Sequence, residues 1–351
     1  MMDFDASLLV RENIRNMKPY STAREEFSGE AAVFLDANEN AFGSPLPAAF
    51  NRYPDPYQLE LKKKIGSIKG LPAQNIFLGN GSDEAIDLLF RIFCEPGKDN
   101  AIIFPPTYGM YEVSAATNDV LLKEIALTNM FQIDLETLES AIDDRTKLIF
   151  ICSPNNPTGN SIDRESVLMI LNNFNGIVVV DEAYINYSRQ RSFIAELTEY
   201  PNLVLLQTFS KAWGLAALRL GMAFASQVII DYFNKVKYPY NIGLATQQLA
   251  LQALDQVSTI NEWTRQTVEQ REWLAAELQR TPFTKTVFPS DANFLLIRID
   301  QAHELWHYLV VKGIIVRDRS RVSLCEDCLR ITIGTMNENQ QLLEAIKSFY
   351  A

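Results

Sequence analysis

Positive charge is scarce in this 351-residue sequence, because 43 acidic residues outnumber 32 basic ones and give a formal net charge of −11. A protein with this charge repels the phosphate backbone of nucleic acids and the anionic surface of membranes. We therefore expect no nucleic-acid partner. An anionic substrate would need a local cluster of arginines that acts against the overall negative field.

Cysteine, histidine and long apolar runs are also scarce. Four cysteines are too few for a disulfide framework, which favours a cytoplasmic location. Cys325 and Cys328 have metal-like spacing without a second pair, and the histidines, His303 and His307, are expected on a packed helix, so we predict no metal. No apolar run is long enough to span a bilayer and the acidic start does not resemble a signal peptide, so we expect no membrane partner.

Short continuous apolar runs predict the strands of a buried sheet. Their unbroken character is typical of a mainly parallel sheet that is covered on both faces. Helical patterns, such as residues 83–93, lie between the runs, so the sequence predicts α/β organisation with crossover connections. The runs occupy residues 75–79, 101–105, 148–152, 177–181 and 203–208.

The pattern changes after about residue 225, where long helical stretches precede a second set of strand candidates. This change predicts a smaller α+β domain, which we expect the N-terminal segment to join. We assign residues 1–45 to an N-terminal arm and part of the small domain, 46–275 to a large cofactor-binding domain and 276–351 to a small C-terminal domain. The later strand candidates are residues 292–298, 314–317 and 329–333, with helices at 245–257, 262–279, 303–312 and 337–350.

Lys211 has the most informative surroundings in the chain. It follows an apolar run at residues 203–207, stands beside the hydroxyls of Thr208 and Ser210, and precedes Arg219 by eight residues. Such an amine can condense with an aldehyde cofactor whose phosphate is held by the hydroxyls and the arginine. Taken alone, the residue has an equally good alternative as an ordinary surface lysine at a strand-to-helix turn.

Polar residues follow other apolar runs at the same edge of the predicted sheet. Gly81, Ser82 and Asp83 open a helix whose free amides suit a phosphate, although a plain β-to-α turn is the alternative. Asn156 lies in a Ser-Pro-Asn-Asn-Pro-Thr-Gly loop. Because ligands of open α/β sheets bind beyond the carboxyl ends of the strands, these loops predict one pocket.

Asp181 ends a buried apolar run, where a carboxylate is costly unless it meets a cation. A protonated pyridine nitrogen would supply that cation, and Tyr184 is placed to reach the ring hydroxyl together with Asn156. Tyr108 offers an aromatic face to the same ring. The alternatives are a helix N-cap for Asp181 and ordinary packing for Tyr108.

In this order, the motifs resemble those of fold type I pyridoxal-phosphate enzymes, the aspartate aminotransferase superfamily, over nearly the whole chain. The resemblance implies a large domain with a mainly parallel seven-stranded sheet flanked by helices, plus a smaller α+β domain. It implies that Lys211 holds pyridoxal 5′-phosphate covalently and moves protons at the substrate α-carbon. The other implied cofactor contacts are Asp181 to the pyridine nitrogen, Asn156 and Tyr184 to the ring oxygen, Tyr108 to the ring face, and Gly81, Ser82, Asp83, Thr208, Ser210 and Arg219 to the phosphate.

Residues 35–43, residues 51–55, the Lys-Pro-Tyr20 segment and a pair of arginines, Arg317 and Arg330, resemble the signatures of histidinol-phosphate aminotransferases. This resemblance implies transfer of an amino group from L-histidinol phosphate to 2-oxoglutarate, which gives imidazole-acetol phosphate and glutamate. It implies that both arginines bind the substrate phosphate with help from Tyr20, and that Asn156 lies beside the substrate. Tyr53 would reach the cofactor phosphate of the neighbouring subunit, which implies a homodimer.

Three positions depart from the usual family pattern: Ala41 replaces a proline, and Trp213 and Ala217 replace the commoner Phe and Gly near the lysine. We expect Trp213 to lie near the pocket and to affect substrate preference. The alternatives of the same fold are a threonine-phosphate decarboxylase and an aromatic amino acid aminotransferase. A non-catalytic regulator is disfavoured, because no basic segment precedes the domain.

Overall fold

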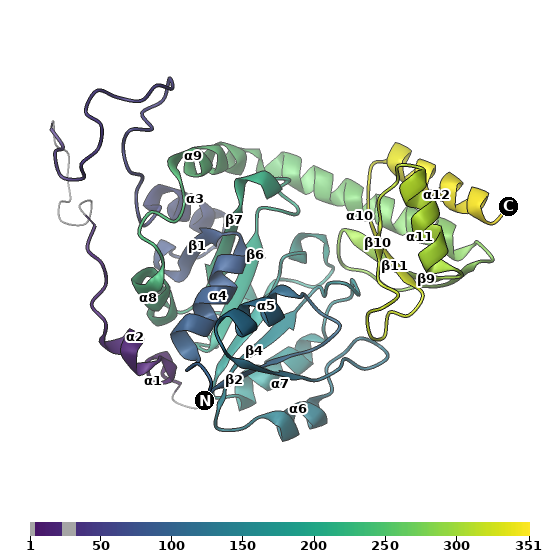
Figure 1. Cartoon of the computed structure of the whole chain (residues 1–351), viewed down its shortest axis with the longest axis horizontal. Helices are drawn as coiled ribbons and strands as arrows, with labels where there is room; N and C mark the ends of the chain where they lie inside the picture. Colours follow the sequence, from purple (N-terminus) through teal and green to yellow (C-terminus); the bar gives the residue numbers. More distant parts are fainter. Residues whose placement is uncertain (1–3, 23–32) are drawn as a thin grey trace.

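The structure, a computed structural model, describes residues 4–22 and 33–351 and contains two sheets at opposite ends of the long helix α10 (Figure 1). The larger sheet has the strand order β1-β7-β6-β5-β4-β2-β3. Its strands run parallel from β3 to β6, whereas β7 is antiparallel to both of its neighbours. The strands are β1 (Ile76–Asn80), β2 (Asn100–Ile103), β3 (Leu121–Glu124), β4 (Thr146–Cys152), β5 (Ile177–Asp181), β6 (Leu203–Thr208) and β7 (Leu220–Phe224).

Alternate side chains of the central strands point into two separate cores. In β5, Ile177 and Val179 belong to one core, whereas Val178 and Val180 belong to the other, and all four are fully buried. Helices cover both faces, which explains why the strands carry continuous apolar runs. One core contains side chains of α1 (Ala6–Leu9), α2 (Glu12–Asn16), α4 (Ser82–Phe93), α5 (Met110–Thr117) and α8 (Gln227–Val236), and the other those of α3 (Leu59–Lys69), α6 (Leu135–Ala141), α7 (Arg164–Asn173) and α9 (Leu244–Ala253).

The smaller sheet is fully antiparallel, in the order β10-β11-β9-β8. Three helices pack against it through a third core that includes Leu274, Ile297, Leu305 and Ile346. The elements are α10 (Val257–Gln279), β8 (Thr284–Val287), β9 (Phe294–Ile299), α11 (Ala302–Val311), β10 (Arg317–Asp318), β11 (Cys328–Thr332) and α12 (Met336–Phe349).

The predicted fold class is confirmed, although the sequence did not indicate β3, β7 or β8. The side chains of β3 are exposed or only partly buried at the edge of the sheet, so this strand has no apolar run. β7 begins directly after Arg219, within a segment that the sequence suggested only as a phosphate-binding loop. The domain limits at residues 45 and 275 stay predictions; α10 continues through residue 275, and α1 and α2 pack on the large sheet's core.

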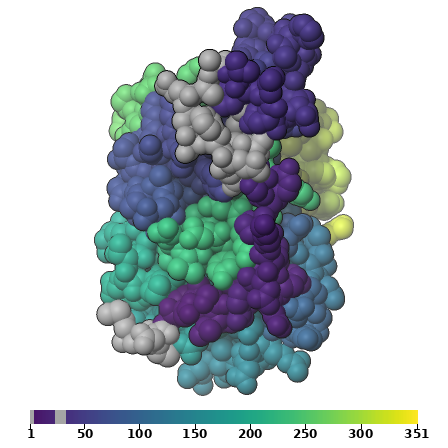
Figure 2. Space-filling view, turned by 90° about the vertical axis from the view of Figure 1, so that its left-hand side faces the viewer, coloured from purple at the N-terminus to yellow at the C-terminus, as the bar shows by residue number. Residues whose placement is uncertain are grey.

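Residues 33–55 form an arm that leaves the body of the molecule (Figures 1 and 2). Figure 2 shows it as a dark purple projection above the surface of the large domain. Its apolar side chains face solvent, since Leu35 is 85% exposed and Phe42 is 102% exposed. Among the described residues, no helix has the length and apolarity that crossing a bilayer requires.

Candidate active site

A cavity of about 690 Å³ lies at the carboxyl ends of the parallel strands, between the large sheet and the small domain. It collects residues that are far apart in the sequence, as expected for the ligand crevice of an α/β sheet. All of the predicted site residues line it except Tyr20 and Tyr53. The predicted residues in its lining are Gly81, Ser82, Asp83, Tyr108, Asn156, Asp181, Tyr184, Thr208, Ser210, Lys211, Arg219, Arg317 and Arg330.

One end of the cavity is a cradle at the start of α4. Gly81 precedes this helix with a φ of 73°, a left-handed conformation that favours glycine. A Cβ atom at this position would lie 2.7 Å from the guanidinium of Arg219, so another residue here would displace that side chain. The hydroxyls of Thr208 and Ser210 lie 3.0 Å apart beside it. Together with the amides that begin the helix, these groups can hold an anion.

Asp83 orients the cationic part of the cradle with its side chain. Its carboxylate forms an ion pair of 3.2 Å with the guanidinium of Arg219 and accepts a hydrogen bond of 3.0 Å from the hydroxyl of Tyr108. Burial, followed by the charge of Asp83, raises the pKa of Tyr108. The sequence predicted a role only for the backbone amide of Asp83.

Asp181 lies on the floor of the cavity at the end of β5 and is 3% exposed. Burial raises the pKa of its carboxyl to about 6, although the hydroxyl of Tyr111 and the amide of Ala183 donate hydrogen bonds to it at 2.8 and 3.1 Å. Among the described residues, no cation lies within ion-pair distance of this carboxylate. Its charge is therefore available to a cationic ligand.

The two successive asparagines at the start of the Asn-Asn-Pro-Thr-Gly loop have different roles. Asn155 is buried, donates to the carbonyl of Pro106 at 2.8 Å and accepts from Thr107 at 3.0 Å, so it holds the loop in place. Asn156 faces the cavity instead. Its side-chain amide lies 3.5 Å from the hydroxyl of Tyr184, so both polar groups are presented to the same space.

Lys211 follows β6, and its side chain lines the floor of the cavity together with Asp181 and Asn156. Its Nζ lies 5.4 Å from the ring centre of Tyr184. Burial and the positive charge of Arg330 lower the pKa of this amine. A larger fraction of the amine is therefore neutral at a given pH, which is the form that can attack a carbonyl or accept a proton.

The wall opposite the cradle belongs to the small domain and carries arginines. Arg317 and Arg330 are directly paired across β10 and β11. The guanidinium of Arg330 donates to the side-chain oxygen of Asn156 and lies 5.4 Å from the ring centre of Phe294. Burial lowers the pKa of Arg330, so its charge is partly desolvated.

Sequence reasoning missed several residues of this site. Tyr111 had no local signal, because its hydrogen bond to Asp181 joins residues that are 70 apart in the sequence. Arg319 lines the wall with Arg317, two residues earlier, but it lies outside the two-residue strand β10, so strand periodicity gave no signal for it. No sequence signal distinguishes the remaining lining residues, which are Thr107, Gly109, Met110, Val113, Cys152, Pro157, Ala183, Ala216 and Val322.

Three predicted residues lie away from the cavity. Tyr20 is 74% exposed and lines a separate hollow beside α8, and Tyr53 is 51% exposed and stacks on Tyr240 with ring centres 4.4 Å apart. The expectation for Trp213 was wrong. Its side chain is buried, packs on Phe209 with ring centres 5.2 Å apart, and lines a separate small hollow with Ile65 and Leu254 instead of the cavity.

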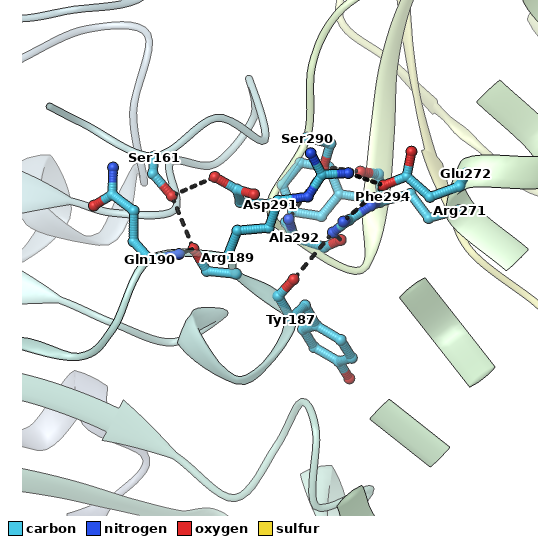
Figure 3. A network of polar contacts seen from close by, with 11 residues as sticks. Ser161, Tyr187, Arg189, Gln190, Arg271, Glu272, Ser290, Asp291, Ala292 and Phe294 are labelled. Carbon is cyan, nitrogen blue, oxygen red and sulfur yellow. Dashed lines mark hydrogen bonds and ion pairs between the residues drawn. The ribbon is translucent and has the colours of Figure 1, made fainter. Parts of the chain in front are cut away.

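A polar network fixes the loops beside the cavity to the small domain (Figure 3). The buried guanidinium of Arg271 in α10 donates to the carbonyls of Tyr187 and Ala292 at 3.3 and 2.8 Å. Asp291 accepts a hydrogen bond of 2.7 Å from Ser161, which follows the Asn-Pro-Thr-Gly loop. The network therefore ties that loop to the segment that leads into β9.

Comparison with known proteins agrees with this geometry. Residues 38–346 match the family model "Aminotransferase class I and II". The histidinol-phosphate aminotransferase of Cytophaga hutchinsonii is 52% identical over 348 residues, which covers 99% of this chain and 100% of that protein. The crystal structure of the histidinol-phosphate aminotransferase from Clostridium acetobutylicum has a TM-score of 0.78 at 27% identity, covering 85% of this chain and 90% of that one. The Sinorhizobium meliloti enzyme in complex with pyridoxal-5′-phosphate shares the fold, with a TM-score of 0.77 at 24% identity and coverage of 89% and 90%.

Proposed function

Because the chain belongs to the class I and II aminotransferases, and within them to the histidinol-phosphate aminotransferases, we propose that it transfers the amino group of L-histidinol phosphate to 2-oxoglutarate. The products are imidazole-acetol phosphate and glutamate, in a step of histidine biosynthesis. The observation that carries this proposal is the arrangement of one cavity. The amine of Lys211 lies in it together with an anion cradle, a buried carboxylate and a wall of arginines.

The cavity residues fit pyridoxal 5′-phosphate. The cradle holds Gly81 in a left-handed conformation and is lined by hydroxyls and a guanidinium, as a phosphate requires. The carboxylate of Asp181 is buried with only uncharged donors around it, as a protonated pyridine nitrogen requires. When bound, this cofactor supplies an aldehyde that takes up the amino group and a ring that stabilises negative charge at the substrate α-carbon.

The protein residues then have separable roles. The neutral amine of Lys211 removes the proton from the substrate α-carbon and returns one, and its lowered pKa favours this work. Asp181 holds its negative charge against the ring nitrogen, with Tyr111 fixing the carboxylate through a hydrogen bond of 2.8 Å. Asn156 and Tyr184 would orient the ring oxygen, and Tyr108 would cover the ring face.

Arg317 and Arg330 would bind the far end of each substrate. Guanidinium groups form charge-assisted hydrogen bonds with phosphate and with carboxylate, so one wall serves histidinol phosphate in one half-reaction and glutamate in the other. The decarboxylase and the aromatic aminotransferase are not favoured, because the relatives that share about half of this sequence are histidinol-phosphate aminotransferases.

A homodimer forms part of the proposal. Tyr20 and Tyr53 lie outside the cavity of their own chain and are exposed, so they are available to a neighbouring subunit. The exposed apolar side chains of the arm, such as Leu35 and Phe42, favour a covered position against a second copy. We place the enzyme in the cytoplasm, since its four cysteines are buried thiols.

The absorption spectrum of the purified protein loaded with pyridoxal 5′-phosphate tests the proposed function. Addition of histidinol phosphate alone is expected to convert the cofactor to its pyridoxamine form, and 2-oxoglutarate is expected to convert it back. Glutamate alone should give the same conversion. Conversion by glutamate but not by histidinol phosphate would contradict the substrate assignment, whereas release of carbon dioxide from threonine phosphate would favour the decarboxylase.

A further inference from the structure

The arginine wall contains a third cation, Arg319, which lines the cavity with Arg317 and Arg330. The three guanidiniums are close enough to affect one another. Burial lowers the pKa of Arg330, and the nearby charge of Arg319 contributes more to this effect than that of Arg317. Burial and the charge of Arg317 in turn lower the pKa of Arg319. The wall therefore concentrates positive charge in a protein whose net charge is −11.

No carboxylate within residues 4–22 and 33–351 forms an ion pair with any of these three guanidiniums. Asp318 stands between two of the arginines in sequence, but its carboxylate is engaged elsewhere. It lies 2.7 Å from the Nδ1 of His303 on α11 and accepts the amide hydrogen of Ser320 at 2.8 Å. An anionic ligand can therefore relieve the repulsion among the three guanidiniums.

The backbone holds Arg319 in a fixed position. Its amide donates to the carbonyl of Cys328 at 2.9 Å, and its carbonyl accepts from the amide of Val322 at 2.9 Å. The following loop is pinned by Arg298, which donates to the carbonyls of Leu324 and Glu326 at 3.1 and 3.0 Å. The guanidinium of Arg319 also donates to the backbone carbonyl of Asp318 at 3.4 Å, so part of the ordering of this side chain precedes ligand binding.

We propose that Arg319 is a specificity residue that makes the wall prefer a dianionic phosphate monoester to a singly charged carboxylate. The inference rests on the proposed function, because it concerns the far end of the same substrate. Each carboxylate of glutamate carries a single charge and two acceptor oxygens, which two guanidiniums already satisfy. A phosphate monoester carries about −1.5 to −2 at pH 7 and three acceptor oxygens, so a third guanidinium adds a further charge-assisted contact only for the phosphate.

The test compares Arg319→Gln with Arg321→Gln in the loaded enzyme. Arg321 is exposed in the same loop and does not line the cavity, so this control removes the same charge without touching the wall. Arg319→Gln is expected to lower kcat/KM for histidinol phosphate by about tenfold or more and for glutamate by less than about threefold. It is also expected to raise the inhibition constant of inorganic phosphate in the glutamate half-reaction by about tenfold. Arg321→Gln should change each value by less than about twofold.

Equal losses for the two amino donors, or the same losses in the control, would overturn the inference. If Arg319→Gln does not fold, Arg319→Lys provides the second test, because it keeps the charge and should keep a preference for the phosphate substrate. A wild-type enzyme that accepts glutamate but not histidinol phosphate would contradict the proposed function. Inhibition by inorganic phosphate would still report on Arg319 in that case.

Discussion

The floor and the wall of the cavity are built in opposite ways. The floor, formed by Asp181, Asn156 and Lys211, follows strands of a sheet that is buried on both faces, and its central charge is a negative one with no cationic partner among the described residues. The wall is formed by Arg317 on the two-residue strand β10, Arg319 in the loop after it and Arg330 on β11, and its charges are positive. The floor therefore presents a negative charge that needs a cation, and the wall presents positive charges that need an anion.

The residues of the floor therefore carry out the reaction, whereas those of the wall select the substrate. A cation bound on the floor and an anion bound at the wall satisfy both surfaces at once, so a ligand pair that spans the cavity gains from each side. Changes to the floor should abolish the reaction for every substrate. Changes to the wall should alter the preference among substrates while the reaction itself persists.

The largest effect is expected at the floor, from Lys211→Ala. Loss of the amine removes both the covalent partner of the cofactor and the group that moves the proton, so kcat should fall by roughly 10⁴-fold or more for histidinol phosphate and glutamate alike. Steady-state kinetics measure this loss. Mass spectrometry after chemical reduction should find no attached cofactor. Lys211→Arg keeps the positive charge and should be equally inactive; activity within tenfold of wild type in either variant would refute the role of the amine.

A smaller and selective effect is expected at the wall, from Arg330→Ala. Loss of a charge-assisted pair should weaken transition-state binding of histidinol phosphate by about 2–4 kcal/mol, measured as the fall in kcat/KM. Unphosphorylated histidinol is the matched control substrate and should lose much less. Equal losses for the two amines would show that the guanidinium does not bind the phosphate, and would leave the fold assignment intact.

Asp181→Asn should change the stability of the cofactor-free protein in a pH-dependent way. The pKa of this carboxyl is about 6 in the folded chain, above its ordinary value of 3.8, so ionisation of the buried group opposes folding. The protonated carboxyl carries no such cost, so its contribution to stability is complete below pH 3.8 and is lost as the pH rises through 6. The free energy of unfolding of the wild type should therefore fall by about 3 kcal/mol over this range relative to the variant.

Urea unfolding at pH 4.5 and pH 7.5 captures about 2 kcal/mol of this difference, because part of it is already lost at pH 4.5. Asp144→Asn, at an exposed position on the surface, is the matched control and should leave the pH dependence unchanged. A pH dependence that survives in Asp181→Asn would place the responsible group elsewhere. With the cofactor present, the same variant should lose cofactor more readily, because the partner of the ring nitrogen is gone.

The floor could be predicted from the sequence far better than the wall. Asp181 and Lys211 end continuous apolar runs, so their positions at one edge of the sheet follow from the strand pattern alone. Arg317 and Arg330 were indicated by family resemblance, and Arg319 was missed because β10 is only two residues long. Tyr111 was missed because its hydrogen bond to Asp181 joins residues 70 apart in the sequence, which no local pattern encodes.

The smallest effect is expected from a substitution of Tyr53, which tests whether this residue completes the site of the neighbouring subunit. Tyr53→Phe removes one hydroxyl, so the cofactor should dissociate about fivefold more readily, equivalent to about 1 kcal/mol for one hydrogen bond. Tyr238→Phe is the control, because this tyrosine is 77% exposed and lies outside the arm.

Mixed dimers of Lys211→Ala and Tyr53→Phe chains decide which subunit Tyr53 serves. If it reaches across the interface, the one site with an intact lysine receives the unmodified tyrosine from the Lys211→Ala chain, and its cofactor affinity should equal that of wild type. If Tyr53 acts in its own chain, the intact lysine lies beside Phe, and the fivefold weaker binding should persist. Cofactor titration of the purified mixed dimer distinguishes the two arrangements, and a monomeric protein in solution would refute the one that reaches across the interface.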